Sequence, residues 1–255
     1  MEEYNSELSD VDTIDSLKSS EDTSKFIKIV MKNYDYKVKT YKFIESKLNA
    51  TYGIPMVTEI ELNGSRNPLI IIPGYSFSSF TKMFNKIITT LDILNDKYSA
   101  LYIVTFSDTI KRTSEELIKD VTDKDKQYII NEKYRIELAD MLSKIIKNIA
   151  NAKGFTTYDL MGKSAGGGVA SYIASNNIDN VNALYLISPG SNSHGLNLLK
   201  FNNPVKLSWN KDDNIISFDE IILWITNLKN KNGTFMYYSY ETGGHELNPM
   251  FIKEL

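Results

Sequence analysis

Short apolar runs separated by longer amphipathic stretches dominate the pattern of hydrophobic and polar positions along the chain. These runs are continuous instead of alternating, and each ends at a loop. They cover residues 69–74, 100–106, 156–162, 181–190 and 204–209. Continuous apolar runs are typical of strands that are buried on both faces of a parallel sheet. We therefore predict a mostly parallel sheet built from these segments.

The amphipathic stretches between the runs predict helices. They cover residues 78–94, 131–152, 165–175 and 217–228. Apolar residues between Ile136 and Ile149 recur at three- and four-residue spacing, which forms one apolar face of a helix. Strands that alternate with helices predict right-handed βαβ units and therefore an α/β fold, with helices flanking a mostly parallel central sheet. The charged segment 120–126 predicts a surface loop.

The N-terminal region divides into two parts by composition. Residues 1–24 are rich in Asp, Glu and Ser, so they bury too little apolar surface to offset the entropy of ordering, and we predict a disordered acidic tail. A short docking helix over 11–19 is the alternative. Residues 26–62 have a β-like pattern and predict leading antiparallel strands. We expect 25–255 to form one domain, since α/β chains of this length routinely do so.

Composition and charge narrow the classes of partner. The formal net charge is −3. It provides no broad electropositive surface for nucleic acid, so we expect no nucleic-acid partner. The chain has no cysteine, which excludes disulfides, cysteine-based metal sites and a thiol nucleophile. Its two histidines, His194 and His245, are too few for a histidine-rich metal centre, so we expect no such centre.

No apolar segment is long enough to cross a membrane. The longest apolar run lies near residues 69–73, far short of the roughly 18 residues that a bilayer requires. The first residues are acidic and contain no apolar core segment, so they resemble neither a secretory signal nor a basic transit peptide. We therefore expect a cytoplasmic protein without a membrane span.

A glycine-flanked serine lies at residues 162–166, where Gly162-Lys163-Ser164-Ala165-Gly166 matches G-x-S-x-G. The motif directly follows a predicted buried strand and directly precedes a predicted helix. A nucleophile on a sharp strand-to-helix turn needs glycines on either side, because close packing of strand and helix leaves no room for side chains. The pattern indicates a nucleophilic serine, although a glycine-rich loop between a strand and a helix can also be purely structural.

Two other glycine-rich motifs do not fit this segment. A phosphate-binding P-loop would require glycine at position 157, which is Thr157. A dinucleotide fingerprint that begins at Gly166 would require glycine at position 171, which is Ser171. The spacing therefore favours the serine nucleophile over a nucleotide-binding loop.

A histidine and a pair of acids also follow predicted strands. His245 lies in a Gly-Gly-His segment after the β-rich run 234–241, and Asp212 and Asp213 follow the run 204–209. A carboxylate beside an imidazole can hold it in one tautomer and stabilise its protonated form. A zinc-protease reading of His245-Glu246 fails, because Pro249 stands where the second histidine is required. Surface positions for the histidine and the acids remain the structural alternative.

With these motifs in place, the chain from about Tyr36 to the C-terminus resembles the α/β-hydrolase superfamily. The resemblance is carried by LIIIPGYS, LMGKSAGGG, WNKDDNIIS and GGHELNP. It implies Ser164 as nucleophile, His245 as general base and Asp213 as the acid, in the order Ser, Asp, His expected for the fold. Asp213 is preferred because one residue and two apolar residues follow it, with Asp212 as the substitute.

The resemblance also implies an oxyanion hole formed by the backbone N–H groups of Ala165 and Tyr75. The chain departs from many members at Pro73, where they have a histidine, which makes Tyr75 the less certain donor. Between the sixth and seventh strands of the family, about fifteen residues (189–203) leave room for little or no cap domain. An open site lined by Phe77 and Leu196, together with Tyr75, is therefore expected.

Two polar residues near the motifs receive structural interpretations. Lys163 stands where members often have His or Glu. A cation there either favours an anionic substrate or pairs with a local acid, and we expect a tolerated structural residue. His194 lies in the short segment before the seventh strand of the family and is expected to be a solvent-exposed loop histidine.

Taken together, the motifs predict a serine hydrolase that cleaves a carboxylic ester or related acyl compound through an acyl-enzyme, without a cofactor. The partner implied is a small-molecule acyl substrate. Two alternatives stay open: a non-catalytic binding or scaffold protein that keeps the fold, and an acyltransferase that uses the same three residues. Peptidases, thioesterases and lyases share this fold, so the fold alone does not identify the reaction.

Overall fold

The computed structural model describes residues 2–3, 23–43, 55–74, 77–105, 117–177, 179–190, 194–231 and 233–255. The described helices are α1 (Thr23–Met31), α3 (Phe77–Ile88), α4 (Leu91–Lys97), α6 (Lys124–Lys153), α7 (Ala165–Asn176), α8 (Glu220–Leu228) and α9 (Pro249–Ile252), with 3-10 helices η3 (Lys32–Tyr34) and η4 (Leu196–Leu198).

The described strands form one sheet. They are β1 (Glu2–Glu3), β2 (Val38–Lys42), β3 (Met56–Glu61), β4 (Leu69–Ile72), β5 (Ala100–Thr105), β6 (Tyr158–Lys163), β7 (Val181–Ile187), β8 (Val205–Asn210) and β9 (Phe235–Tyr240). Their order in the sheet is β1-β2-β3-β5-β4-β6-β7-β8-β9. The pairs from β1 to β5 are antiparallel, and the pairs from β5 onwards through β4 to β9 are parallel. The prediction of a mostly parallel α/β sheet is confirmed.

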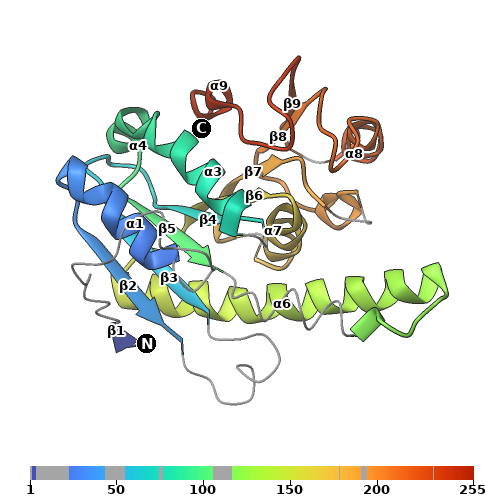
Figure 1. The fold of residues 1–255 in the computed structure, drawn as a ribbon, viewed down its shortest axis with the longest axis horizontal. Helices are drawn as coiled ribbons and strands as arrows, with labels where there is room; N and C mark the ends of the chain where they lie inside the picture. Colours follow the sequence, from blue (N-terminus) through green and yellow to red (C-terminus); the bar gives the residue numbers. More distant parts are fainter. Residues whose placement is uncertain are drawn as a thin grey trace.

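Helices cover both faces of the sheet and enclose two apolar cores. One core lies between the sheet and α6, α7 and α8, and the other between the sheet and α1, α3, α4 and α9. Figure 1 shows α6 crossing the molecule as its longest helix, with α1, α3 and α4 gathered on the other side of the sheet. Because both faces are covered, the central strands are apolar on both sides, as their continuous runs predicted.

The structure corrects three local expectations. Residues 26–31, expected to be β-like, lie in helix α1, which begins at Thr23, and Phe26, Ile27 and Met31 in it are buried. A helix, not a charged loop, already begins at Lys124, because the Asp123 side chain accepts hydrogen bonds from the first N–H groups of α6. The single helix expected over 78–94 is divided into α3 and α4.

The N-terminal tail is described at only a few positions. Glu2 and Glu3 pair with Lys42 and Tyr41 at the edge of the sheet, so these two residues form a strand and are not part of a disordered tail. Most of the remaining residues of the segment 1–24, including the alternative helix over 11–19, lie outside the described residues. Disorder there stays a prediction.

The segment between β7 and β8 is short, as expected. Its described part contains η4 and turns, which cover little of the sheet's edge. The prediction of little or no cap domain at this position is therefore confirmed. Away from the sheet, α6 extends past the rest of the fold at its N-terminal end (Figure 1), where its first ten residues bury no side chain.

Candidate active site

The three residues predicted to form the site follow three strands that run in the same direction. Ser164 follows β6, Asp213 lies just after β8, and His245 lies after β9. These strands are parallel within the contiguous group β6-β7-β8-β9, so their carboxyl ends share one edge of the sheet. Ligand crevices of open α/β sheets lie at this edge.

Ser164 occupies a strained turn between β6 and α7. Its backbone has φ 54° and ψ −126°, a positive-φ conformation that is unfavourable for a residue with a side chain. The two glycines of the motif are required by packing. A Cβ on Gly166 would lie 2.3 Å from the carbonyl oxygens of Ile72 and Pro73, and one on Gly162 would lie 2.5 Å from the Gly166 oxygen. The turn therefore packs Gly166 closely against the end of the neighbouring strand β4.

Backbone hydrogen bonds stabilise this turn. The Ser164 carbonyl accepts from Gly167 N at 2.9 Å and from Gly190 N, in the loop after β7, at 2.8 Å. A Cβ on Gly190 would lie 3.6 Å from Ala165 N and 3.4 Å from Ile216 Cδ1. Gly190 therefore lies between the serine turn and Ile216 of the loop after β8, at ordinary contact distance from both.

Asp213 and His245 are joined by a hydrogen bond. His245 Nδ1 lies 2.8 Å from Asp213 Oδ2, the Asp213 side chain is fully buried, and the His245 side chain is 12% exposed. The other carboxylate oxygen accepts from the N–H groups of Ile215 and Ile216 at 2.9 Å each. Burial raises the pKa of Asp213, but the hydrogen bonds from His245, Ile216 and Ile215 together outweigh it and lower the pKa below its ordinary value. The carboxylate is therefore ionised beside the imidazole at neutral pH.

The second imidazole nitrogen has no hydrogen-bond partner among the described residues. His245 Nε2 is buried, and Nδ1 is already bound to Asp213. With its Nδ1–H donated to the carboxylate, the neutral ring has its lone pair on Nε2. His245 Nε2 can therefore accept a proton, and it lies at the same edge of the sheet as Ser164.

Asp212 contacts the backbone of the loop that carries His245 instead of the imidazole. This loop, residues 241–248 between β9 and α9, is called the histidine loop below. Its exposed carboxylate accepts from Gly243 N at 3.2 Å and Gly244 N at 2.7 Å. Asn210, which the sequence interpretation missed, donates through Nδ2 to the carbonyls of Gly244 and Glu246 at 2.8 Å each. Its signal was a polar residue at the buried end of an apolar strand.

The structure describes some of the other predicted site residues completely and others only in part or not at all. Tyr75, the second proposed oxyanion donor, lies outside the described residues. For Phe77 the backbone is described at the start of α3, and its side chain is not. Leu196 lies in η4 with 53% of its surface exposed. Ala165 is the first residue of α7, so its N–H has no acceptor within the helix.

His194 is not the solvent-exposed loop residue that was expected. Its backbone has a positive φ of 43°, and its side chain is only 22% exposed. The ring contacts the Glu220 carboxylate through Nε2 and lies edge-on to Trp224, with ring centroids 6.4 Å apart. These contacts tie the loop after β7 to helix α8.

Lys163 is buried and paired with an acid. Its side chain is fully buried, and Nζ lies 2.9 Å from Glu246 Oε2. Of the two roles considered from the sequence, pairing with a local acid is the one that the structure shows. Glu246 directly follows His245, so this ion pair joins distant segments of the chain, and no sequence pattern predicted it.

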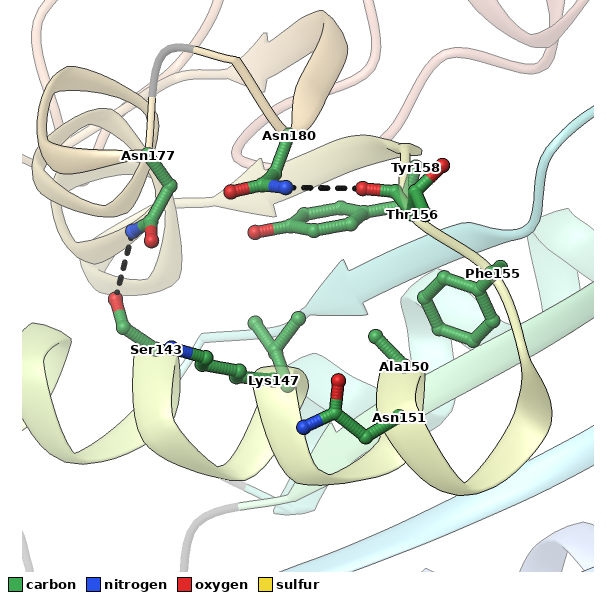
Figure 2. A pocket seen from close by; sticks show the side chains of 10 residues that line it. Ser143, Lys147, Ala150, Asn151, Phe155, Thr156, Tyr158, Asn177 and Asn180 are labelled. Atoms are coloured by element: carbon green, nitrogen blue, oxygen red, sulfur yellow. Dashed lines mark hydrogen bonds between the residues drawn. The ribbon is translucent and has the colours of Figure 1, made fainter.

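A pocket of about 200 Å³ lies elsewhere in the fold. It is lined from α6, from the end of α7 and from the start of β6, with the Asn177, Asn180 and Tyr158 side chains arranged around it (Figure 2). Tyr158 begins β6 and Ser164 follows its end, so about 20 Å of strand separates them at roughly 3.3 Å per residue. This pocket therefore lies at the opposite edge of the sheet from the three residues.

Two features were absent from the part of the chain that the structure describes. No group of three or more His, Cys, Asp or Glu side chains there is placed to bind a metal ion. No helix in the described ranges combines the length and the apolarity that crossing a bilayer requires.

Comparisons with known proteins identify the fold. The chain matches no protein-family model and no curated protein sequence. Among solved structures, it is similar to a CIB-like hydrolase from Thermoplasma acidophilum (15% identity, 86% of this chain and 93% of that one, TM-score 0.54). An α/β serine hydrolase homologue from Coxiella burnetii is also similar (13% identity, 81% and 88%, TM-score 0.54), as is dienelactone hydrolase from Anabaena variabilis (12% identity, 82% and 88%, TM-score 0.54). The expected α/β-hydrolase fold is thus confirmed.

Proposed function

We propose that the protein is a serine hydrolase that cleaves a carboxylic ester or a related acyl compound through an acyl-enzyme. Ser164 is the nucleophile, His245 the general base and Asp213 the acid that orients the imidazole. One observation carries the proposal. A largely buried imidazole donates to a buried carboxylate, keeps its buried Nε2 without a partner among the described residues, and lies at the edge of the sheet that also carries the strained serine turn.

The proposed reaction has two steps. His245 Nε2 removes the proton from Ser164 Oγ as the oxygen attacks the acyl carbon, and then returns that proton to the leaving alcohol. Water, activated by the same nitrogen, attacks the acyl-enzyme, and the serine regains its proton. The ionised Asp213 stabilises the imidazolium that forms in each step and holds the ring in the required tautomer.

Backbone N–H groups complete the proposed site. The Ala165 N–H, at the N-terminus of α7, and the Tyr75 N–H would donate to the negative oxygen of the tetrahedral intermediate. Leu196 and Phe77 would contact the substrate, and the short segment before β8 leaves this side of the site open. Hydrolases among the structural neighbours support a reaction of this kind, although fold similarity does not identify the substrate.

The test is covalent labelling of Ser164. A fluorophosphonate probe should label the wild-type protein, and the Ser164→Ala variant should remain unlabelled and inactive on soluble acyl esters. Ser175 provides a matched control, because its hydroxyl donates to the Tyr172 carbonyl in α7 and Ser175→Ala should label normally. A folded wild type that is not labelled would favour a binding protein. Ester turnover by Ser164→Ala at the wild-type rate would overturn the proposal, and transfer of the acyl group to an added alcohol would favour an acyltransferase.

A further inference from the structure

Lys163 combines complete burial with a position directly before Ser164. It is the last residue of β6, and it ranks among the largest fully buried side chains in the described part of the chain. Burying a charged amine away from water costs free energy unless an opposite charge lies close to it. Burial lowers the pKa of Lys163, and Glu246 and Asp213 act in the opposite direction by favouring its charged form. The lysine is therefore part of the electrostatic environment of the site.

Glu246 provides the compensating charge from directly after His245. Its Oε2 lies 2.9 Å from Lys163 Nζ, and its Oε1 lies 4.0 Å from the Nζ of Lys82 on α3. The Lys82 side chain is 64% exposed, so that outer contact is weak. The inner contact, with Lys163 fully buried and Glu246 22% exposed, is the strong one.

The ion pair joins the two segments that carry the proposed reacting residues. Ser164 is bonded to Lys163, and His245 is bonded to Glu246, so one contact links the residue before the nucleophile to the residue after the base. Asp213 and its neighbours bind the histidine loop only to the end of β8. Lys163 binds the same loop to β6, the strand that carries the serine.

We infer that Lys163 and Glu246 form a positioning pair, which sets the separation of Ser164 and His245 and balances the charge beside the imidazole. The inference rests on the proposed function. Neither side chain is assigned contact with the substrate, because both act through the residues to which they are bonded.

A purely stabilising role does not require charges at this location. Buried ion pairs contribute little net stability relative to a well-packed apolar pair, since desolvation offsets their attraction. The ion pair does, however, bring Lys163 Nζ within 2.9 Å of Glu246 Oε2 and so places the end of β6 against the segment that carries His245. Removal of either partner changes this contact and the charge balance around Lys163, Glu246 and Asp213.

The fold contains a matched control pair far from the serine turn. Lys153 Nζ lies 2.6 Å from Glu59 Oε2, with side-chain exposures of 25% and 5%. Glu59 also accepts from the hydroxyls of Tyr41 and Tyr102. This pair joins the end of α6 to β3, so Lys153→Met should destabilise the fold without changing turnover.

The experiment measures kcat, KM, the pH profile of kcat/KM and the thermal midpoint in Lys163→Met, Glu246→Gln, the double variant Lys163→Met/Glu246→Met and Lys153→Met. Each single change at the pair should lower kcat by about 10- to 100-fold, the cost of a misplaced reacting group, and leave KM nearly unchanged. The double variant should retain the kcat loss. Lys153→Met should keep the wild-type kcat.

The pH profile separates positioning from general destabilisation. Lys163→Met leaves the Glu246 carboxylate, directly after His245, without its cation. The remaining anion favours the imidazolium and should move the acid limb of the kcat/KM profile to higher pH. Glu246→Gln removes the anion directly after the histidine and should move the limb to lower pH. The double variant removes both charges, so its limb should return close to the wild-type position.

Nuclear magnetic resonance gives a readout that does not depend on turnover. The chain has two histidines, so a His194→Gln variant assigns the remaining imidazole signals to His245. The titration of His245 should move in opposite directions in the two single variants. The positioning role would be overturned if Lys163→Met and Glu246→Gln left kcat and the His245 titration unchanged. It would also be overturned if they lowered kcat only as much as Lys153→Met does. A wild type without probe labelling or turnover would instead overturn the proposed function, and the titrations would still test the pair.

Discussion

Replacement of Asp213 by asparagine tests the proposed acid most directly, because the structure separates its hydrogen bonds by atom. Oδ1 accepts from the two backbone N–H groups of Ile215 and Ile216, and Oδ2 contacts His245 Nδ1. Asparagine keeps an oxygen for the two backbone groups. Its NH₂ group then faces the imidazole, which must accept at Nδ1 and carry its proton on Nε2.

The imidazole in that tautomer has no lone pair on the nitrogen that faces the serine. An amide in place of the acid of a Ser-His-Asp triad lowers kcat by about 10⁴-fold, because the imidazole is held in the wrong tautomer. That factor corresponds to about 5.4 kcal/mol of activation free energy at 1.36 kcal/mol per tenfold change. The two backbone hydrogen bonds survive, so we expect a folded Asp213→Asn protein with a kcat about 10⁴-fold lower.

Asp212→Asn is the matched control. Its carboxylate is exposed and contacts only backbone N–H groups in the described loop, and one amide oxygen can still accept from them. Exposed substitutions of this kind change free energies by about 0.5 kcal/mol or less, so kcat should stay within about twofold. Steady-state kinetics on a soluble ester, with circular dichroism as the folding check, compare the two variants. A greater loss in Asp212→Asn would transfer the role of the acid to Asp212.

Three further predictions concern the same fold. Ser164→Ala and His245→Ala should each lower kcat by about 10⁴- to 10⁶-fold, and the double variant should be hardly worse in the same ester assay, since residues that act as a unit are not additive. The lowered pKa of Asp213 stabilises the fold above the unfolded-state value of about 3.9, and this contribution is lost as pH falls through the lower folded-state pKa. The stability difference between wild type and Asp213→Asn in urea titrations should therefore shrink below about pH 4; a constant difference down to pH 2 would contradict this. Deletion of residues 1–22 should change kcat little and the free energy of unfolding by about 1 kcal/mol or less, because only the two residue pairs of β1 are lost from the described sheet; a large drop in the thermal midpoint would show that the segment docks.

The buried strands were predictable from sequence because burial on both faces leaves a simple signal. The runs at 69–74, 100–106 and 204–209 correspond to β4, β5 and β8 within two residues. Each of these strands lies between two helical layers, so apolar residues predominate in the runs, and the few polar residues, such as Thr105 and Ser208, are buried with them. The sheet order could not be read in the same way, since it depends on contacts between distant segments.

Helix boundaries were less predictable, because short-range interactions decide them. The apolar residues Phe26, Ile27, Val30 and Met31 recur with helical spacing, which the β-like interpretation of 26–62 did not separate from the strands that follow. The break between α3 and α4 lies at Thr90, whose hydroxyl donates to the carbonyls of Lys86 and Ile87. Such side-chain hydrogen bonds compete with helix continuation, and they leave little trace in hydrophobic periodicity.

Residues of the candidate site could be predicted only where a reactive side chain lies in a short, recognisable sequence motif. Ser164 was found because a strained turn requires glycines close by in the sequence, so the signal is local. Lys163 and Glu246 depend on a long-range contact between β6 and the histidine loop. A lysine in a strand is ordinarily interpreted as an exposed position, and only the folded structure shows the acid that neutralises it.

The two adjacent acids show how the backbone divides roles that the sequence leaves open. Asp213 is buried and binds the imidazole, whereas Asp212 is exposed and binds the N–H groups of Gly243 and Gly244. The first contact holds the His245 ring, and the second holds the backbone of the two glycines that precede it. The Asp212 carboxylate already accepts hydrogen bonds from the Gly243 and Gly244 N–H groups, so it would have to break them to contact the imidazole in place of Asp213. The two carboxylates are therefore complementary parts of one support for the histidine, and neither is a spare copy of the other.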